Sequence, residues 1–225
     1  MRTVLITGAN GGLGTAVTRA FLDAGTRVAG VARSIAEAEF PSPHFHAISA
    51  SLEHPQAARD VAQAVIDKWG RIDALVHLVG GFAAGLTVDA TTDEVLEQML
   101  TVNLRSAFHM LGAVIPHMRA QGSGAILAIG SRAAVEPAAT LGAYSASKAA
   151  LVSLIRTVAL ENRGISANVI LPGTLDTPVN RAAMPTADPT KWVRPSQVAA
   201  LLVHLASPAA SDITGAVIPV YGNGL

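Results

Sequence analysis

The sequence predicts an α/β fold in which an open, doubly wound parallel sheet of about seven strands carries helices on both faces. Short runs of Val, Ile, Leu and Ala are nearly continuous in apolar residues, as strands that are buried on both faces must be. Longer segments with a helical period of apolar residues separate these runs, and crossover helices between parallel strands produce this alternation. A chain of 225 residues commonly forms one such domain, so we expect a single domain over residues 1–225.

The elements alternate in order along the chain. The apolar runs predict strands at Thr3–Thr7, Arg27–Val31, Phe45–Ser49, Ala74–Val79, Ala125–Ile129, Ala167–Leu171 and Ala216–Val220. Amphipathic spacing predicts helices over Leu13–Asp23, Pro55–Lys68, Thr92–Met118, Leu141–Glu161 and Pro195–Leu205. Thr91 and Glu94 have the spacing of a capping box at the start of the third helix.

The composition argues against several partners and sites. Lys plus Arg and Asp plus Glu each number 16 and no basic cluster stands out, so we expect neither nucleic acid nor a membrane as a partner. The absence of cysteine excludes disulfides and thiolate metal sites and permits an intracellular compartment, and we expect a cytoplasmic protein. Only His44 and His46 lie close together, and without carboxylate or thiolate partners they predict a solvated loop and no metal site.

The first chemical motif is TGANGGLG, Thr7–Gly14, between the first predicted strand and the first predicted helix. Gly8, Gly12 and Gly14 permit a tight turn and let backbone N–H groups approach a pyrophosphate at the helix N-terminus. This position predicts the dinucleotide-binding turn of a Rossmann fold. The alternative is a glycine-rich turn that binds no ligand.

Two further segments carry candidate acid–base groups. In YSASK, Tyr144 and Lys148 share one face of a helix, where the ammonium favours the ionised phenol and lowers its pKa from about 10. Ser131 follows a predicted strand at the edge where parallel sheets bind ligands. Asn103 interrupts an apolar helical stripe, and a buried amide there needs partners that are either structural or part of a catalytic network.

Together these motifs resemble those of the short-chain dehydrogenase/reductase family over nearly the whole chain. The family's TG-x-x-x-G-x-G occurs at Thr7–Gly14, its Pro-Gly turn at Pro172–Gly173, its closing segment as ITGAVIPV, and its catalytic set at Asn103, Ser131, Tyr144 and Lys148. The resemblance implies that Tyr144 exchanges a proton while a nicotinamide exchanges hydride, and that Ser131 holds the substrate oxygen. It also implies that Lys148 bonds the nicotinamide ribose and that Asn103 anchors a proton-relay water.

The same resemblance implies a set of cofactor contacts, with Thr177 at the carboxamide. They are Gly8, Asn10, Gly11, Gly12, Leu13, Gly14, Arg33, Ser34, Ser51, Leu52, Gly80, Tyr144, Lys148, Pro172, Gly173 and Thr177. Three positions depart from the family pattern: HLVG, His77–Gly80, replaces Asn-Asn-Ala-Gly, Ser51 replaces the Asp beside the adenine, and Tyr221 replaces a common Asp. We expect His77 to pack at the end of its strand and to take no part in catalysis.

The segment after the Pro-Gly turn, about residues 174–194, holds three of the chain's prolines and is predicted to be a substrate lid. Its pattern LDTP-x-NR-x-x-MP-x-AD-x-x-x-W resembles the same segment of dihydropteridine reductase, and VGGFAAG is also similar to that enzyme. This resemblance implies that Arg181, Met184 and Trp192 close over a flat, polar heterocycle. We expect Asp176 and Asn180 to brace the lid.

Cofactor choice is read at the end of the second strand, in TRVAGVARS. NAD-preferring members place a carboxylate there, which bonds the ribose hydroxyls and repels a 2′-phosphate. Here the residue is Ala32, and Arg33 and Ser34 follow it, so we expect NADP(H). Two points oppose this choice: Asn10 and Gly11 supply no second basic residue, and dihydropteridine reductase prefers NADH. The alternative for Arg33 is a solvated surface charge.

The predicted function is an NADP(H)-dependent oxidoreductase acting on a carbonyl or alcohol group of a small molecule. A dihydropteridine-reductase-like activity on a pterin is one alternative, although Ser131 and the other motifs are those of ordinary carbonyl reductases. A catalytically silent dinucleotide sensor is the alternative from another class, but a sensor needs no proton donor. By resemblance we expect a homotetramer or dimer built from Thr92–Met118 and Leu141–Glu161, whose apolar residues exceed one buried face.

Overall fold

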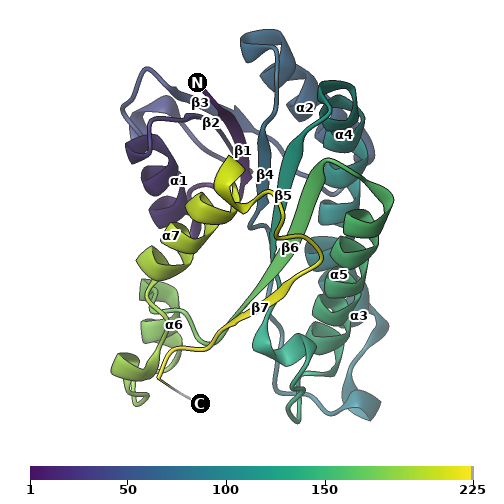
Figure 1. The fold of residues 1–225 in the computed structure, drawn as a ribbon. Coiled ribbons are helices and arrows are strands. Elements are labelled where there is room, and N and C mark those ends of the chain that lie inside the picture. Colours follow the sequence, from purple (N-terminus) through teal and green to yellow (C-terminus); the bar gives the residue numbers. More distant parts are fainter. Residues whose placement is uncertain (224–225) are drawn as a thin grey trace.

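The computed structural model describes residues 1–223 and contains the predicted parallel sheet (Figure 1). Its strands are β1 (Thr3–Thr7), β2 (Arg27–Ala32), β3 (Phe45–Ser49), β4 (Ala74–His77), β5 (Gly124–Ile129), β6 (Ile165–Pro172) and β7 (Val217–Val220). Each pairs in parallel with its neighbours in the order β3-β2-β1-β4-β5-β6-β7. The fold class is therefore confirmed.

The helices cover both faces of this sheet. They are α1 (Gly14–Asp23), α2 (Pro55–Trp69), α3 (Asp93–Leu100), α4 (Ser106–Gln121), α5 (Gly142–Glu161), α6 (Pro178–Ala183) and α7 (Pro195–Leu205). α1 packs against α7 on one face, and α2 and α4 pack together on the other, where α5 also lies (Figure 1). Within residues 1–223, no helix has both the length and the hydropathy of a membrane span.

Alternating side chains of the strands divide the core between the two faces. Leu5 of β1 and Leu75 of β4 belong to the cluster under α2, α4 and α5, whereas Val4, Ile6 and Val76 belong to the cluster under α1 and α7. Successive residues of a strand point to opposite faces, and here both faces are buried, so a continuous apolar run is the pattern that such a strand requires.

The predicted helix over Thr92–Met118 is divided by a π-helical turn at Thr101–Arg105, with α3 before it and α4 after it. The predicted capping box is wrong. The N-cap is Thr92, because both the N–H and the hydroxyl of Thr91 donate to the carbonyl oxygen of Thr87 and hold Thr91 in the preceding turn. The Thr92 hydroxyl instead bonds Glu94 and lowers the pKa of that carboxyl.

His46 is half-buried on β3, inside the strand predicted at Phe45–Ser49, so the solvated loop expected for it is wrong. Its Nδ1 lies 3.1 Å from a carboxylate oxygen of Glu37, which belongs to the short helical turn Glu37–Glu39 before the strand. The sequence separation of nine residues concealed this pairing, because the chain between them folds back onto the sheet edge.

The predicted lid is tied down at both ends. Leu175 and Val193 form an isolated parallel bridge, and the Val193 N–H donates to the carbonyl oxygen of Thr174. Inside the lid, Arg181 makes two hydrogen bonds to Asp176, and the Asn180 amide donates to the carbonyl oxygen of Leu175. The bracing expected of Asp176 and Asn180 is therefore confirmed, and the segment contains α6, which the sequence did not predict.

Candidate active site

The glycine motif forms a tight turn at the carboxyl end of β1. Gly8 has a φ of 69°, and its N–H donates to the carbonyl oxygen of Val31. A Cβ on Gly14 would overlap the carbonyl oxygen of Gly8, so only glycine lets α1 start this close to the strand. α1 has no acidic residue in its first turn, which leaves the positive end of the helix dipole available to an anion. The turn fits a dinucleotide pyrophosphate.

The predicted lid segment packs against this turn. A Cβ on Gly12 would lie 3.1 Å from Cγ2 of Thr177, which is buried and caps the N-terminus of α6. Gly173, before the lid, packs against the backbone of Tyr221 with equally little room. The structure thus brings together the predicted contacts from the glycine turn and from the segment after β6, including Pro172 at the buried end of that strand.

The residues predicted for the adenosine end lie around the carboxyl end of β2. The Asn10 amide donates to the carbonyl oxygen of Ser34 at 2.8 Å and to Glu39 Oε2 at 3.1 Å. Arg33 is exposed beside this cluster. Ser51 is exposed, whereas the Leu52 side chain belongs to the core and its carbonyl oxygen accepts from His109.

Asn103 lies in the π-helical turn and is fully buried. Its Oδ1 accepts from the Gly81 N–H at 2.9 Å, and its Nδ2 donates to Ser147 Oγ at 3.0 Å and to the Gly81 carbonyl oxygen at 3.2 Å. The wider turn points this amide at α5 and at the loop after β4. A Cβ on Gly80 would lie 2.9 Å from Asn103 Oδ1 and 3.1 Å from Lys148 Nζ, so Gly80 lets these two side chains meet.

Lys148 is buried, and its Nζ donates to the carbonyl oxygen of Ile129 at 2.8 Å. Burial lowers the pKa of Lys148 from 10.5 to about 8. Burial also raises the pKa of Tyr144, and a hydrogen bond with Ser131 partly offsets that shift. The predicted lowering of the Tyr144 pKa by Lys148 is therefore wrong for this structure, because the ammonium turns to the end of β5.

His77 packs at the buried end of β4, as expected. Its Nδ1 lies 3.0 Å from Thr7 Oγ1 and its Nε2 lies 3.2 Å from Ser106 Oγ. The Ser106 hydroxyl donates to the Val102 carbonyl oxygen, so it accepts from Nε2–H and leaves Nδ1 to accept from Thr7. Burial, with the nearby charge of Lys148, lowers the pKa of His77 to about 3 and keeps the ring neutral.

The lid residues lie apart from these groups. Arg181 is held by Asp176, Met184 is exposed, and Trp192 is half-buried. Arg181 and Trp192 border a cavity of about 620 Å³ between the lid, the start of α7 and the end of β7. Neither Ser131 nor Tyr144 borders that cavity.

Sequence reasoning missed Gly81, Ser147 and Phe82. The first two fix the Asn103 amide, and the Phe82 ring packs edge-on against Tyr144 with centroids 4.9 Å apart. Only their position in the sequence could have indicated a role in the site. Gly81 and Phe82 stand at the carboxyl end of a central strand, and Ser147 precedes Lys148.

A family model described as short chain dehydrogenase matches residues 2–188. The chain is 32% identical to the short chain dehydrogenase adrF of Penicillium rubens, covering 96% of this chain and 94% of that protein. It is 32% identical to the 2,3-dihydro-2,3-dihydroxybenzoate dehydrogenase of Escherichia coli, covering 95% and 92%. A 3-ketoacyl-(acyl-carrier-protein) reductase from Brucella melitensis, solved with NADH, superposes with a TM-score of 0.88 at 26% identity, covering 100% and 98%.

Proposed function

The chain belongs to the short-chain dehydrogenase/reductase family, and on that premise we propose that it moves hydride between NADP(H) and a carbonyl or alcohol group of a small molecule. Family membership makes it an oxidoreductase that uses a nicotinamide cofactor. The observation that supports the reaction is the meeting of Asn103, Gly80 and Lys148 beside the hydrogen-bonded pair Ser131 and Tyr144. We assign this chemistry to one domain over residues 1–225 with a lid at about 174–194.

The glycine turn, Thr177 and the groups around Asn10 would hold the dinucleotide, whose nicotinamide would supply or accept hydride at the substrate carbon. Tyr144 gives its phenolic proton to the carbonyl oxygen during reduction and takes a proton from the alcohol during oxidation. Ser131 holds the same oxygen, since its hydroxyl already bonds Tyr144. Lys148, buried with its Nζ on the Ile129 carbonyl oxygen, would bond the nicotinamide ribose. Asn103 keeps the loop after β4 in place.

NADP(H) is the proposed cofactor because Ala32, at the end of β2, carries no charge to repel a 2′-phosphate. Arg33 is exposed next to it, and a guanidinium binds phosphate through two parallel hydrogen bonds. The nearby carboxylate of Glu39 is engaged by the Asn10 amide and the Ala36 N–H. The absence of cysteine supports a cytoplasmic location.

The reaction is tested with Tyr144→Phe, which keeps the ring and removes the proton donor. We expect turnover to fall at least ~100-fold with cofactor affinity nearly intact. Wild type and variant are compared for NADPH and NADH oxidation against ketones, aldehydes, quinones and quinonoid dihydropterin. Equal turnover by the two proteins contradicts the role of Tyr144.

The same screen decides between the alternatives. Exclusive use of the dihydropterin supports the pterin reductase that the lid sequence resembles. Tight NADPH binding without turnover of any compound supports the dinucleotide sensor.

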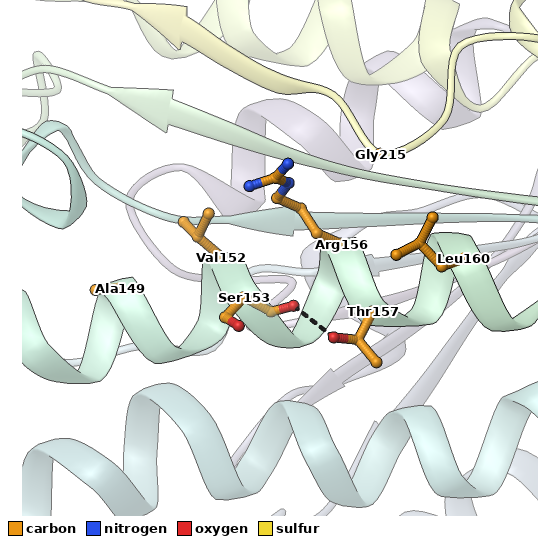
Figure 2. Close-up of a pocket in the computed structure, with 7 residues that line it drawn as sticks. All are labelled: Ala149, Val152, Ser153, Arg156, Thr157, Leu160 and Gly215. Carbon is orange, nitrogen blue, oxygen red and sulfur yellow. Dashed lines mark hydrogen bonds between the residues drawn. The ribbon is translucent and has the colours of Figure 1, made fainter.

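A homotetramer or dimer built from the faces of α4 and α5 is the proposed assembly. Leu160 of α5 is 88% exposed. It borders a shallow hollow of about 560 Å³ formed with Gly215 and other residues of the same helix, and Figure 2 shows Arg156 and Leu160 rising from α5 beside it. The hollow is lined by Ala149, Val152, Ser153, Arg156, Thr157, Leu160 and Gly215. Exposed apolar side chains such as Leu160 are buried when copies associate.

A further inference from the structure

Exposed apolar side chains are concentrated at the edge of the sheet formed by the carboxyl ends of its strands. Six of the ten large hydrophobic residues that are exposed within residues 1–223 lie in the segments between the ends of β4, β5 and β6 and the next helix or in the lid. They are Phe82, Leu86, Val88, Val135, Val179 and Met184. Because β4, β5 and β6 are neighbours and parallel, these segments share the edge that carries Ser131. Apolar surface concentrated beside candidate reacting groups indicates a ligand site.

Phe82 is the member of this group that contacts Tyr144. Its ring meets the Tyr144 ring edge-on, with an interplanar angle of 74° and centroids 4.9 Å apart. The Phe82 side chain is nevertheless 68% exposed, so most of the ring stays open to a ligand. An aromatic ring held this way offers a flat apolar surface directly beside the phenol.

The backbone that carries Phe82 is fixed on two sides. The side-chain amide of Asn103 holds Gly81 through two hydrogen bonds, since its Oδ1 accepts from the Gly81 N–H and its Nδ2 donates to the Gly81 carbonyl oxygen. Farther along the loop, the Gly85 N–H donates to the carbonyl oxygen of Thr140 at 3.1 Å. Thr140, four residues before Tyr144, has a φ of 65°, a conformation that costs free energy in a non-glycine residue. The loop after β4 and the segment before α5 are thus docked on each other, which sets Phe82 against Tyr144.

Two arginines at this edge are already paired. Arg132, next to Ser131, bonds Glu136 at 2.7 Å and lies over the Tyr221 ring. Arg181 in the lid bonds Asp176 at 2.6 Å. An anionic substrate bound by Arg132 or Arg181 would have to break one of these pairs, whereas an apolar one uses the surface that is already exposed.

We propose that Phe82 forms the aromatic wall of the substrate site and that the substrate carries its carbonyl or alcohol on an apolar ring. This assignment rests on the proposed oxidoreductase function. Ring and wall stack face to face in an offset arrangement, with the substrate oxygen toward the Tyr144 hydroxyl. A short polar ketone reaches the same phenol without touching the wall.

The test compares α-tetralone, an aryl ketone on a fused ring, with acetoin, a short polar ketone. For Phe82→Ala we expect kcat/KM for α-tetralone to fall roughly ten-fold or more, within the range of lost ring contacts, while kcat/KM for acetoin changes less than about two-fold. Phe82→Tyr keeps the wall and restores α-tetralone. Ile213→Ala removes an exposed apolar side chain, 38% exposed, from the segment before β7 and leaves both substrates unchanged.

Equal losses on the two ketones, or no loss on either, overturn the assignment of Phe82. Preference of the wild type for acetoin overturns the substrate class while leaving the oxidoreductase function intact. Calorimetric binding of α-tetralone to the Tyr144→Phe protein, with and without Phe82→Ala, separates the two levels. If Phe82→Ala weakens the affinity for α-tetralone, the result supports the wall even if no turnover is seen. If the affinity is the same with and without Phe82→Ala, the wall is refuted.

Discussion

At the scale of single residues, we expect Arg33 to decide the choice of cofactor. Arg33→Ala should raise the KM for NADPH roughly ten-fold, equivalent to about 1.4 kcal/mol, because a charge-assisted phosphate contact is lost. The KM for NADH should barely change, since NADH has no phosphate at that position. Glu39→Gln removes a negative charge from the same cluster and should lower the KM for NADPH instead. Steady-state kinetics with both cofactors measure these shifts. Equal effects of Arg33→Ala on the two cofactors, or a wild-type preference for NADH, show that Arg33 does not read the phosphate.

Residue-level prediction succeeded where the partner is local or burial alone decides. Asn103 was expected to be buried and bonded because it interrupts an apolar stripe, and it is. The Tyr144–Lys148 spacing predicted a shared helix face but missed the direction of the tyrosine pKa. Spacing on one helix cannot reveal that the ammonium finds the Ile129 carbonyl oxygen on a distant strand.

At the scale of elements, His77 joins β4 to β1 through Thr7 and to α4 through Ser106, and this junction makes stability depend on pH. The pKa of His77 is lowered from 6.5 to about 3. Below pH 6.5, His77 therefore binds a proton in the unfolded chain but stays neutral in the folded chain. Stability should fall as pH drops from 6.5, by roughly 2 kcal/mol at pH 5 from this group.

Urea unfolding of wild type and His77→Asn at pH 7.5 and pH 5 measures this contribution. The variant should lose less stability on acidification, because asparagine does not titrate. His204→Asn, at an exposed position in the last turn of α7, should keep the wild-type difference. An unchanged acid loss in His77→Asn would mean that the ring titrates normally in the folded protein.

Element boundaries were predicted well where strands end at glycines or polar turns, as in β1 and β3, which match the expected bounds. The break in the helix over Thr92–Met118 was not predictable from periodicity. The π-helical turn is stabilised by what Asn103 bonds, namely Gly81 and Ser147, and both lie outside that helix.

At the scale of the whole molecule, the sheet order places the candidate groups at one edge, and this much follows from the alternation of strands and helices in the sequence.

The proposed assembly belongs to the same scale. At micromolar concentration, solution scattering should give a mass of two or four chains. Leu160→Asp, on the exposed face of α5, should shift the mass toward one chain, while Val88→Asp, at an equally exposed site on the loop after β4, should not. A monomeric wild type refutes the assembly.

The position of β1 has a consequence for biosynthesis. β1 precedes its partner strands along the chain and lies between β2 and β4, and its Thr3 N–H also bonds the Asp73 carboxylate, some seventy residues later. The nascent chain can pair β1 with β2 early, but the other edge of β1 stays open until β4 emerges. Pairing across such a separation is slow, and an open apolar edge is where chains aggregate. Until β4 has been synthesised, the stretch from β1 to β4 is therefore the part of the chain that most needs to be bound by chaperones.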